Sequence, residues 1–444
     1  MKIDVKKWLK TIENAKGKLK PFYDQAEEAV SAYGQEQDNK PATKADIPIN
    51  WSNIKVLGSA LYSRSPAPEV RKRNVENPDP APKEVSKLLE RAITYQIDVC
   101  DFDTHVKNDR DEYLTAGLGV LRVKYKAKYD AQGFKVPGLE TVKPKHWHYK
   151  NFIWDISKDW DECMWVCYVH TMDMNSVKSK YSDSMKGAPA DVIAKTGKQC
   201  LYEIWDKKPR QVIIIMDGHD KPLQMRPDPL KLENFFDCPK PLMANCRTDK
   251  TIPKPDYYFV QSRIEYINKV QRRIDALTDA IKDVGIHDAS FTEGFKKLAK
   301  ARDNEYIPLA NLIDKLQGNN LDNVIAKLPY EAAATVVVIL EERKTEAIEE
   351  IYQITGLSDI VRGSSKASET ATAQQIKGQW ANVRLSDKQS AINEQLRGLM
   401  RIYAEIICEQ FSDETLFSMT GIQVTPEMRQ IMSNDLLRSY AIDV

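Results

Sequence analysis

The sequence lacks an excess of charge of either sign. Its 65 Lys and Arg residues nearly cancel its 64 Asp and Glu residues, and the formal net charge is +1 at pH 7. Tight, static binding to DNA requires a basic surface that displaces counterions from the phosphates. The balance therefore argues against that kind of binding and permits transient contact with a polyanion. Many proteins of unrelated function show the same balance, so it identifies no function by itself.

Long hydrophobic runs are also missing. The longest largely apolar run, Ala332 to Leu340, is much shorter than the roughly 20 residues that span a bilayer. The N-terminal residues MKIDVKKWLK include no apolar segment of the kind found in signal peptides. The 7 cysteines are scattered and odd in number, which favours free, buried thiols over a disulfide framework. We therefore expect an intracellular protein with no membrane segment.

The common catalytic motifs are absent. The chain has no Walker A loop and no GxSxG, GxGxxG or HExxH motif. The string AGLGV (116–120) holds a pair of glycines at an expected helix-to-strand turn, which is too little to predict a phosphate cradle. No set of carboxylates has the spacing of a nuclease or a polymerase. We therefore predict no catalytic residues and no cofactor.

Two segments resemble metal sites without matching one. In the first, residues 101–112 carry several carboxylates, but on a helix these side chains spread over several faces, which favours a solvated charged surface. In the second, the spacing of Cys163 and Cys167 is not that of a C-x2-C pair and favours a buried strand. We predict no metal site in either segment. The residues that suggested the second site are His146, His148, Cys163, Cys167 and His170.

Apolar spacing predicts a mixed α+β chain that is mainly helical. The first 35 residues, Asn50 to Leu61 with Asn50 as a cap, and Lys83 to Leu114 each follow the period of a helix. From about residue 121 to 250, short runs with β-like alternation predict antiparallel hairpins.

A helix from Asp256 to Val284 shows an apolar seam surrounded by mixed charge. Such a stripe is typical of a helix that packs between neighbouring helices, including those of other copies of the chain. The residues that form the seam at steps of three or four are Ile264, Ile267, Val270, Ile274, Leu277, Ile281 and Val284.

Two long predicted helices flank a loop of small and polar residues. One begins at Pro329 and continues to Ile354, and the other extends from Thr370 to Phe411. The second has an apolar face, which a ring of packed helices could use, made of Ile392, Leu396, Leu399, Tyr403 and Ile406.

The loop between these helices is flexible in composition and weakly basic. Gly and Ser impose little stiffness on a backbone. Two readings of the basic side chains stay open: ordinary surface charge, or a ring of cations that faces phosphates when the chain is repeated around an axis. Those side chains are Arg362, Lys366, Lys377 and Arg384.

The strings ITGLSDIVRG and ETATAQQ, at residues 354–363 and 369–375, closely resemble a segment of podovirus-type portal proteins of tailed bacteriophages. NWSNIKVLGSALYSRSPAPEVR (50–71) and AGLGVLRVKY (116–125) are similar to earlier segments of the same family. The resemblance extends, in order, over nearly the whole chain.

The resemblance implies a portal fold with an α+β wing, a helical stem, a small α/β clip and a long wing helix after a tunnel loop. The implied parts are the wing (1–255), first stem helix (256–285), clip (286–328), second stem helix (329–355), tunnel loop (356–369), long wing helix (370–412) and start of a crown or C-terminal region (413–444). In the tunnel loop, the residues implied to face the DNA channel are Asp359, Arg362, Gly363, Ser364, Ser365, Lys366 and Ser368.

The same resemblance implies a homo-oligomeric ring, usually a dodecamer, at one capsid vertex of the virion, assembled from chains made in the host cytoplasm. Its channel would carry double-stranded DNA without sequence specificity during packaging and ejection. The implied partners are the terminase large subunit, the major capsid and scaffolding proteins and the tail adaptors. Two alternatives remain: an oligomeric virion or adaptor protein without a channel, and a metal-dependent nuclease.

Overall fold

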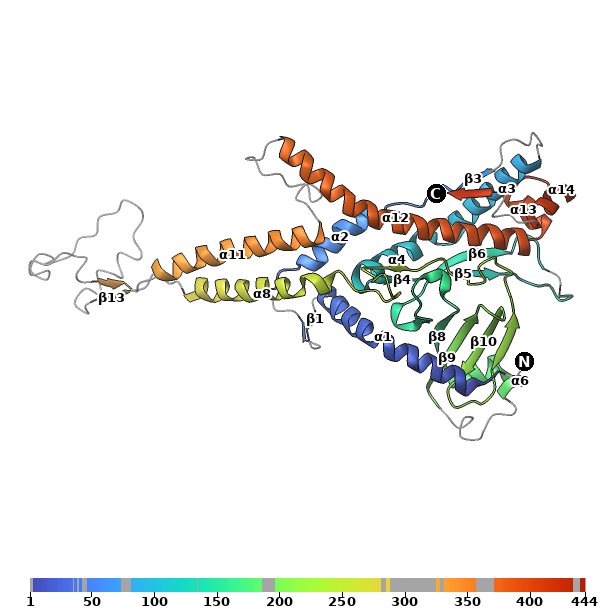
Figure 1. Cartoon of the computed structure of the whole chain (residues 1–444), viewed down its shortest axis with the longest axis horizontal. Helices are drawn as coiled ribbons and strands as arrows, with labels where there is room; N and C mark the ends of the chain where they lie inside the picture. The colour runs from blue at the N-terminus through green and yellow to red at the C-terminus, as the bar shows by residue number, and fades with distance from the viewer. Residues whose placement is uncertain are drawn as a thin grey trace, which may run out of the picture. The chain divides into compact units, whose positions relative to one another are not determined.

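The computed structural model has a mixed α+β fold that is mainly helical, as the sequence predicted. It divides into two compact units (Figure 1), the first formed by Met1–Pro41, Pro48–Val260 and Ile354–Val444, and the second by Ala42–Ile47 and Gln261–Gln353. The residues that the structure describes are 3–34, 36–37, 40–41, 46–72, 81–133, 135–185, 196–280, 285–287, 325–327, 331–356, 371–433 and 440–443.

Helices make up most of the first unit. They are α1 (Val5–Gly34), α2 (Ile49–Leu61), α3 (Ala81–Val99), α4 (Phe102–Ala116), α5 (Met174–Lys180), α6 (Ser182–Met185), α12 (Ala371–Gln410), α13 (Asp413–Thr420) and α14 (Pro426–Ser433), with the short 3-10 helices η1 (Tyr149–Asn151) and η2 (Trp160–Glu162).

The sequence between Lys83 and Leu114 forms two helices, so the prediction of one continuous helix was wrong. α3 ends at Val99, and α4 begins after Asp101, whose backbone is left-handed with a φ of 47°. The apolar spacing continues across this turn because both helices bury their stripes in the same core. The period of the pattern therefore does not reveal the break.

The predicted cap of α2 was also wrong. The helix begins at Ile49, Pro48 occupies the N-cap position, and no side chain makes a capping hydrogen bond there. Asn50 consequently lies inside the helix and not at its end.

The main sheet is antiparallel and has the strand order β11-β10-β9-β8-β7. Its strands are β7 (Phe152–Trp154), β8 (Trp165–Asp173), β9 (Lys198–Asp206), β10 (Gln211–Met216) and β11 (Gln224–Pro227). Two-stranded antiparallel pairs accompany it: β1 (Glu36–Gln37) with β2 (Lys40–Pro41), β3 (Glu69–Lys72) with β15 (Tyr440–Asp443), β4 (Leu118–Gly119) with β12 (Leu242–Met243), and β5 (Leu121–Lys126) with β6 (Thr141–His146).

One core of this unit lies between α1 and the sheet (Figure 1). Leu19, Phe22 and Ala26 are buried at helical spacing on α1. The Phe22 ring lies 6.4 Å from that of Trp154 on β7, and further along the helix Trp8 packs edge to face on Trp165 at 5.9 Å. Aromatic contacts thus fix α1 on the sheet along much of its length.

The second core is mainly helical and joins α3, α4, α12, α13 and α14. The five apolar residues that the sequence places on one face of the long C-terminal helix lie on α12, and each is at most 2% exposed within a single chain. Those residues are Ile392, Leu396, Leu399, Tyr403 and Ile406.

The second unit contains a pair of helices that run in opposite directions: α8 (Tyr257–Ala280), from Gln261 onward, and α11 (Glu331–Thr355). Arg263 Nε lies 2.7 Å from a carboxylate oxygen of Glu350, and Lys344 Nζ donates a hydrogen bond to Gln271 at 3.0 Å. The unit also contains the strand pair β13 (Gly285–His287) and β14 (Ile325–Lys327).

Candidate functional site

The loop expected to face DNA lies outside the described residues. Gly356 ends α11 with a left-handed φ of 73°, as a glycine at the C-terminus of a helix commonly does. The chain is described again from Ala371, where α12 begins. The role of the intervening residues stays a prediction: Asp359, Arg362, Gly363, Ser364, Ser365, Lys366 and Ser368.

The apolar seam of α8 is a packing face within a single chain. Ile264, Ile267 and Ile274 are 8%, 0% and 5% exposed, and Leu277 is half-buried. Ile281 lies outside the described residues. A contribution of the seam to contacts between copies stays a prediction, because Ile264, Ile267 and Ile274 are already buried in a single chain.

The metal-like group of Cys and His residues is divided among different environments. Cys163 and Cys167 are fully buried in the core between α1 and the sheet, as predicted, and burial raises the pKa of the Cys163 thiol to about 12. His146 and His170 each bind a different carboxylate, Glu112 and Glu203. Within the described ranges, no group of three His, Cys, Asp or Glu residues is arranged to hold a metal ion.

The AGLGV segment brings backbones into close contact. Gly117 ends α4 with a φ of 84°, and a Cβ atom at this residue would lie 3.0 Å from the backbone nitrogen of Pro255. A Cβ atom at Gly119 would lie 2.9 Å from both the carbonyl oxygen and a carboxylate oxygen of Asp109. The two glycines therefore serve close packing at this turn and not the binding of phosphate.

Asp109 is the least expected residue of this region. It is 1% exposed, and neither of its carboxylate oxygens has a hydrogen-bond partner among the described residues. Burial raises the pKa of its carboxyl to about 7, while the nearby His146 and Gln395 side chains partly oppose the shift.

The prediction of a solvated charged surface on residues 101–112 was therefore wrong for Asp109. This residue lies three positions after Val106 and four before Tyr113, both of which are buried. That spacing puts all three side chains on the apolar face of α4. The burial of Asp109 could be predicted from the sequence by assigning each carboxylate of this segment to a face of the helix.

Glu112, one turn further along α4, organises the start of the sheet region. Its Oε2 atom lies 2.8 Å from His146 Nε2 and accepts a hydrogen bond from the Tyr149 backbone N–H at 3.1 Å. Burial disfavours the charged imidazole, but the hydrogen bond and charge of Glu112 outweigh it, so the pKa of His146 is raised. The carboxylate links α4 to the end of β6 and to η1.

A second buried network surrounds Arg122 on β5. The guanidinium group is 4% exposed and binds Glu203 on β9 at 2.8 Å and Asp237 at 2.6 Å. Tyr168 donates a hydrogen bond to Asp237 at 2.8 Å, and its ring centre lies 3.8 Å from the Arg122 guanidinium carbon. His170 Nε2 lies 2.6 Å from the other oxygen of Glu203. These contacts are a structural link between the β5–β6 hairpin and the sheet, and they leave no free nucleophile or base.

Residues 63–251 match the family model of the phage P22-like portal protein. The chain carries a P22-like portal domain. None of the curated proteins gives a significant match to the chain. The matched range of the portal domain includes α3, α4, the whole five-stranded sheet, and the Asp109, Glu112 and Arg122 sites. The seam of α8 and the predicted tunnel loop lie outside it.

The P22-like portal family is one of structural, non-enzymatic proteins, so it leaves the nuclease alternative without support. The family implies the role of a phage portal, an oligomeric ring with a DNA channel, and a site at a capsid vertex. In the described part of the chain, no helix is both long and apolar enough to cross a membrane.

Proposed function

We propose that this chain forms a ring at one capsid vertex whose central channel carries double-stranded DNA during packaging and ejection. The match of residues 63–251 to the P22-like portal family is the observation that supports this proposal. In this ring, the terminase large subunit and later the tail adaptors bind the clip, and the major capsid and scaffolding proteins surround the assembly. The chain contributes position and shape, and the chemistry of packaging belongs to the terminase.

We further propose that α8 and α11 form the stem of each subunit and that the tunnel loop between α11 and α12 projects into the channel. The antiparallel pairing of the two helices and their bridging ion pair between Arg263 and Glu350 support a rod-like stem. The near-neutral charge of the chain supports a channel wall on which a polyanion slides without sticking.

A second apolar surface, separate from the seam of α8, is exposed on these two helices. Val338 and Ile339 on α11 are 59% and 50% exposed, and Tyr266 on α8 is 38% exposed. Neighbouring apolar side chains that a single chain leaves in water are typical of an interface with a further copy. We propose that Val338 and Ile339 contact the next subunit of the ring.

The combined substitution Val338→Glu and Ile339→Glu tests the ring. We expect the variant to keep its helical circular dichroism spectrum and to lose the ring in mass photometry and negative-stain images, because charge on every subunit would face the next copy. Glu342→Gln, an exposed position on the same helix, is the matched control and retains the ring.

Two outcomes contradict this reading. If the wild-type protein is monomeric under capsid-assembly conditions, the proposal of a ring is wrong. If it forms a closed oligomer without a central opening, the alternative of an adaptor without a channel is favoured. Ile274→Asp is a poorer test, because a charge at this buried position disrupts the second unit itself.

A further inference from the structure

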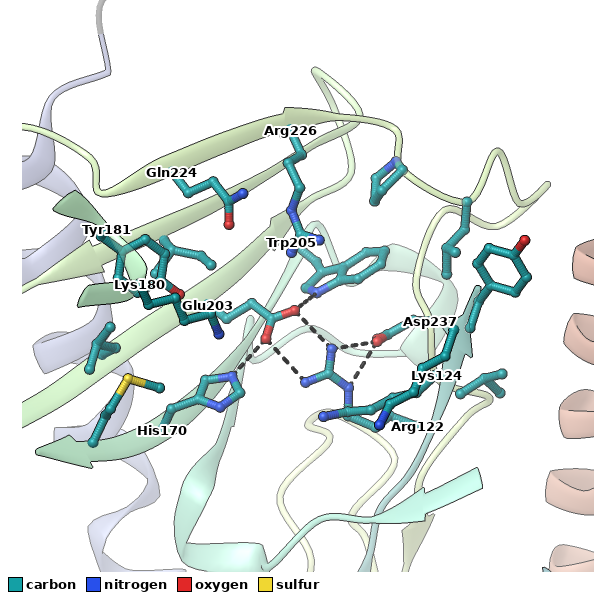
Figure 2. A pocket seen from close by; sticks show the side chains of 18 residues that line it. Arg122, Lys124, His170, Lys180, Tyr181, Glu203, Trp205, Gln224, Arg226 and Asp237 are labelled. Carbon is teal, nitrogen blue, oxygen red and sulfur yellow. Dashed lines mark hydrogen bonds and ion pairs between the residues drawn. The ribbon is translucent and has the colours of Figure 1, made fainter. Parts of the chain in front are cut away.

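A cavity of about 430 Å³ opens in the first unit next to the Arg122 network (Figure 2). Its walls come from β5, β8, β9, β10 and β11, from the end of α5, and from the segment after β11. Leu201, Trp205 and Ile214 supply an apolar part of the lining. The volume is within the usual range for small-ligand sites and is far too small for a DNA duplex.

The lining carries more positive than negative charge. It includes two carboxylates, Glu203 and Asp237, and Arg122 binds both of them. The other cations make no ion pair with a carboxylate in the part of the chain that the structure describes, so the lining carries a net positive formal charge. Those cations are Lys124, Lys126, Lys180 and Arg226.

Two of these cations are partly removed from water. The Nε atom of Arg226 is buried without a hydrogen-bond partner, and in Figure 2 its side chain points toward Trp205. Lys124 is half-buried, and burial together with the charges of Arg122 and Lys145 lowers the pKa of its amine to about 8. A desolvated donor and a desolvated ammonium that face one cavity are unfavourable until an anion joins them.

We propose that this cavity binds a phosphate-bearing anion. A phosphate has three acceptor oxygens and close to two negative charges, which suit several cations that line one cavity from different elements. Arg226 and Lys180 enter from β11 and α5, whereas Lys124 enters from β5. The apolar patch around Trp205 leaves space for an organic group attached to the phosphate, so both inorganic phosphate and a phosphate monoester fit this chemistry.

Isothermal titration of the full-length protein, in chloride buffer at fixed ionic strength, tests the site. Inorganic phosphate, thymidine monophosphate and thymidine are the probes. We expect saturable binding of the first two and none of thymidine. Tighter binding of the monophosphate than of phosphate assigns the site to a monoester, and equal binding assigns it to the free ion. Absence of binding by both phosphate probes at millimolar concentration overturns the proposal.

Variants then locate the binding. We expect Lys124→Gln, Lys180→Gln and Arg226→Gln each to weaken binding at least tenfold. Lys178→Gln, on the same helix as Lys180 but outside the lining, is the matched control and binds as the wild type does. Since Lys180 is exposed, its substitution keeps the test valid if either of the more buried variants unfolds. Unchanged binding in Lys180→Gln, or equal loss in Lys178→Gln, contradicts the site.

The pH dependence of phosphate binding distinguishes a direct role of Lys124 from a purely structural one. Phosphate is mostly a dianion above pH 7, so affinity that falls as pH rises through about 8 reports loss of the proton from Lys124. In Lys124→Gln this fall disappears, and its persistence there contradicts the role of Lys124. The other charged or titratable groups that face this amine or line the cavity are Arg122, Tyr125, Lys126, Lys145, His170, Lys180, Tyr181, Glu203, Arg226 and Asp237.

Discussion

Asp109 makes the stability of the fold depend on pH through a single buried side chain. Its carboxyl has a pKa of about 7 in the folded chain and an ordinary value of 3.8 when it is solvated. Between these two values the folded chain holds a proton that the unfolded chain has lost. The contribution of this group to the free energy of unfolding therefore falls as pH rises from about 4 to about 7 and stays low above that range.

We predict that Asp109→Asn removes this dependence. The wild type loses up to about 4 kcal/mol of stability from this group between pH 4 and pH 8, since one unit of pKa shift corresponds to about 1.4 kcal/mol. The neutral amide avoids that loss, so the variant exceeds the wild type in stability by about 4 kcal/mol at pH 8 but by only about 1.6 kcal/mol at pH 5. Urea unfolding at both pH values measures the difference.

Asp98→Asn is the control for this prediction, because Asp98 is exposed on α3. Its stability difference from the wild type is expected to be the same at pH 5 and pH 8. If the stability difference between Asp109→Asn and the wild type is the same at pH 5 and pH 8, Asp109 is not held in its protonated form.

Single residues also show when a local sequence pattern fails to predict whether a charged side chain is buried. Arg122 lies in LRVKYK, an alternating segment that predicts a half-exposed strand with its charged side chains in water. Its partners Glu203 and Asp237 are 81 and 115 positions away along the chain, so no local pattern reveals that the charge is buried. Asp109 is different, because the helical spacing around it was sufficient to assign its face.

At the scale of elements, the Arg122 network holds the β5–β6 hairpin against the sheet. Replacing both partners of a buried ion pair with apolar residues usually changes the free energy of unfolding little. Removing only one partner leaves the other charge buried and uncompensated, which is strongly destabilising. Two carboxylates depend on this one guanidinium group, and both are at least nine-tenths buried. The link between these elements therefore depends on Arg122 more than on any of its contacts taken alone.

We predict that Arg122→Met destabilises the first unit by about 3–5 kcal/mol, the usual effect of breaking a buried pair from one side. Arg122→Lys keeps the charge but cannot bind two carboxylates with a planar fork, so it is expected to be intermediate. Thermal unfolding followed by circular dichroism measures both. Lys126→Met, on the same strand but exposed, serves as the control, and an equal effect there would contradict a special role for Arg122.

Elements with a strong apolar period were predictable, and their interruptions were not. The apolar face of α12 was evident from spacing alone, whereas its burial within a single chain was not. The turn at Asp101 was hidden because the residue is not a glycine and the stripe continues on both sides. Such breaks depend on how two helices pack on a shared core, which is information at the level of tertiary structure.

At the scale of the whole molecule, the family match and the proposed ring concern different parts of the chain. The portal domain at residues 63–251 carries the recognisable fold, whereas the predicted stem and tunnel loop come from the later chain. A division of this kind is expected if the first unit supplies a stable body, the second unit supplies contacts between subunits, and the loop faces DNA. Substitutions in the two parts then have separable effects: on folding in the portal domain, and on DNA movement in the loop.

The proposed tunnel loop gives the sharpest test of that separation. We predict that replacing Ser364, Ser365 and Ser368 together with Trp leaves ring assembly intact and reduces DNA packaging or retention at least tenfold, because bulky side chains would narrow and stiffen a polar loop in the channel. Negative-stain images measure assembly, and the yield of DNA-filled capsids measures packaging. The matched control replaces the same residues with Ala, which preserves small size and packages normally. If the Trp variant fails to form rings, the loop is part of an interface between subunits and does not face DNA.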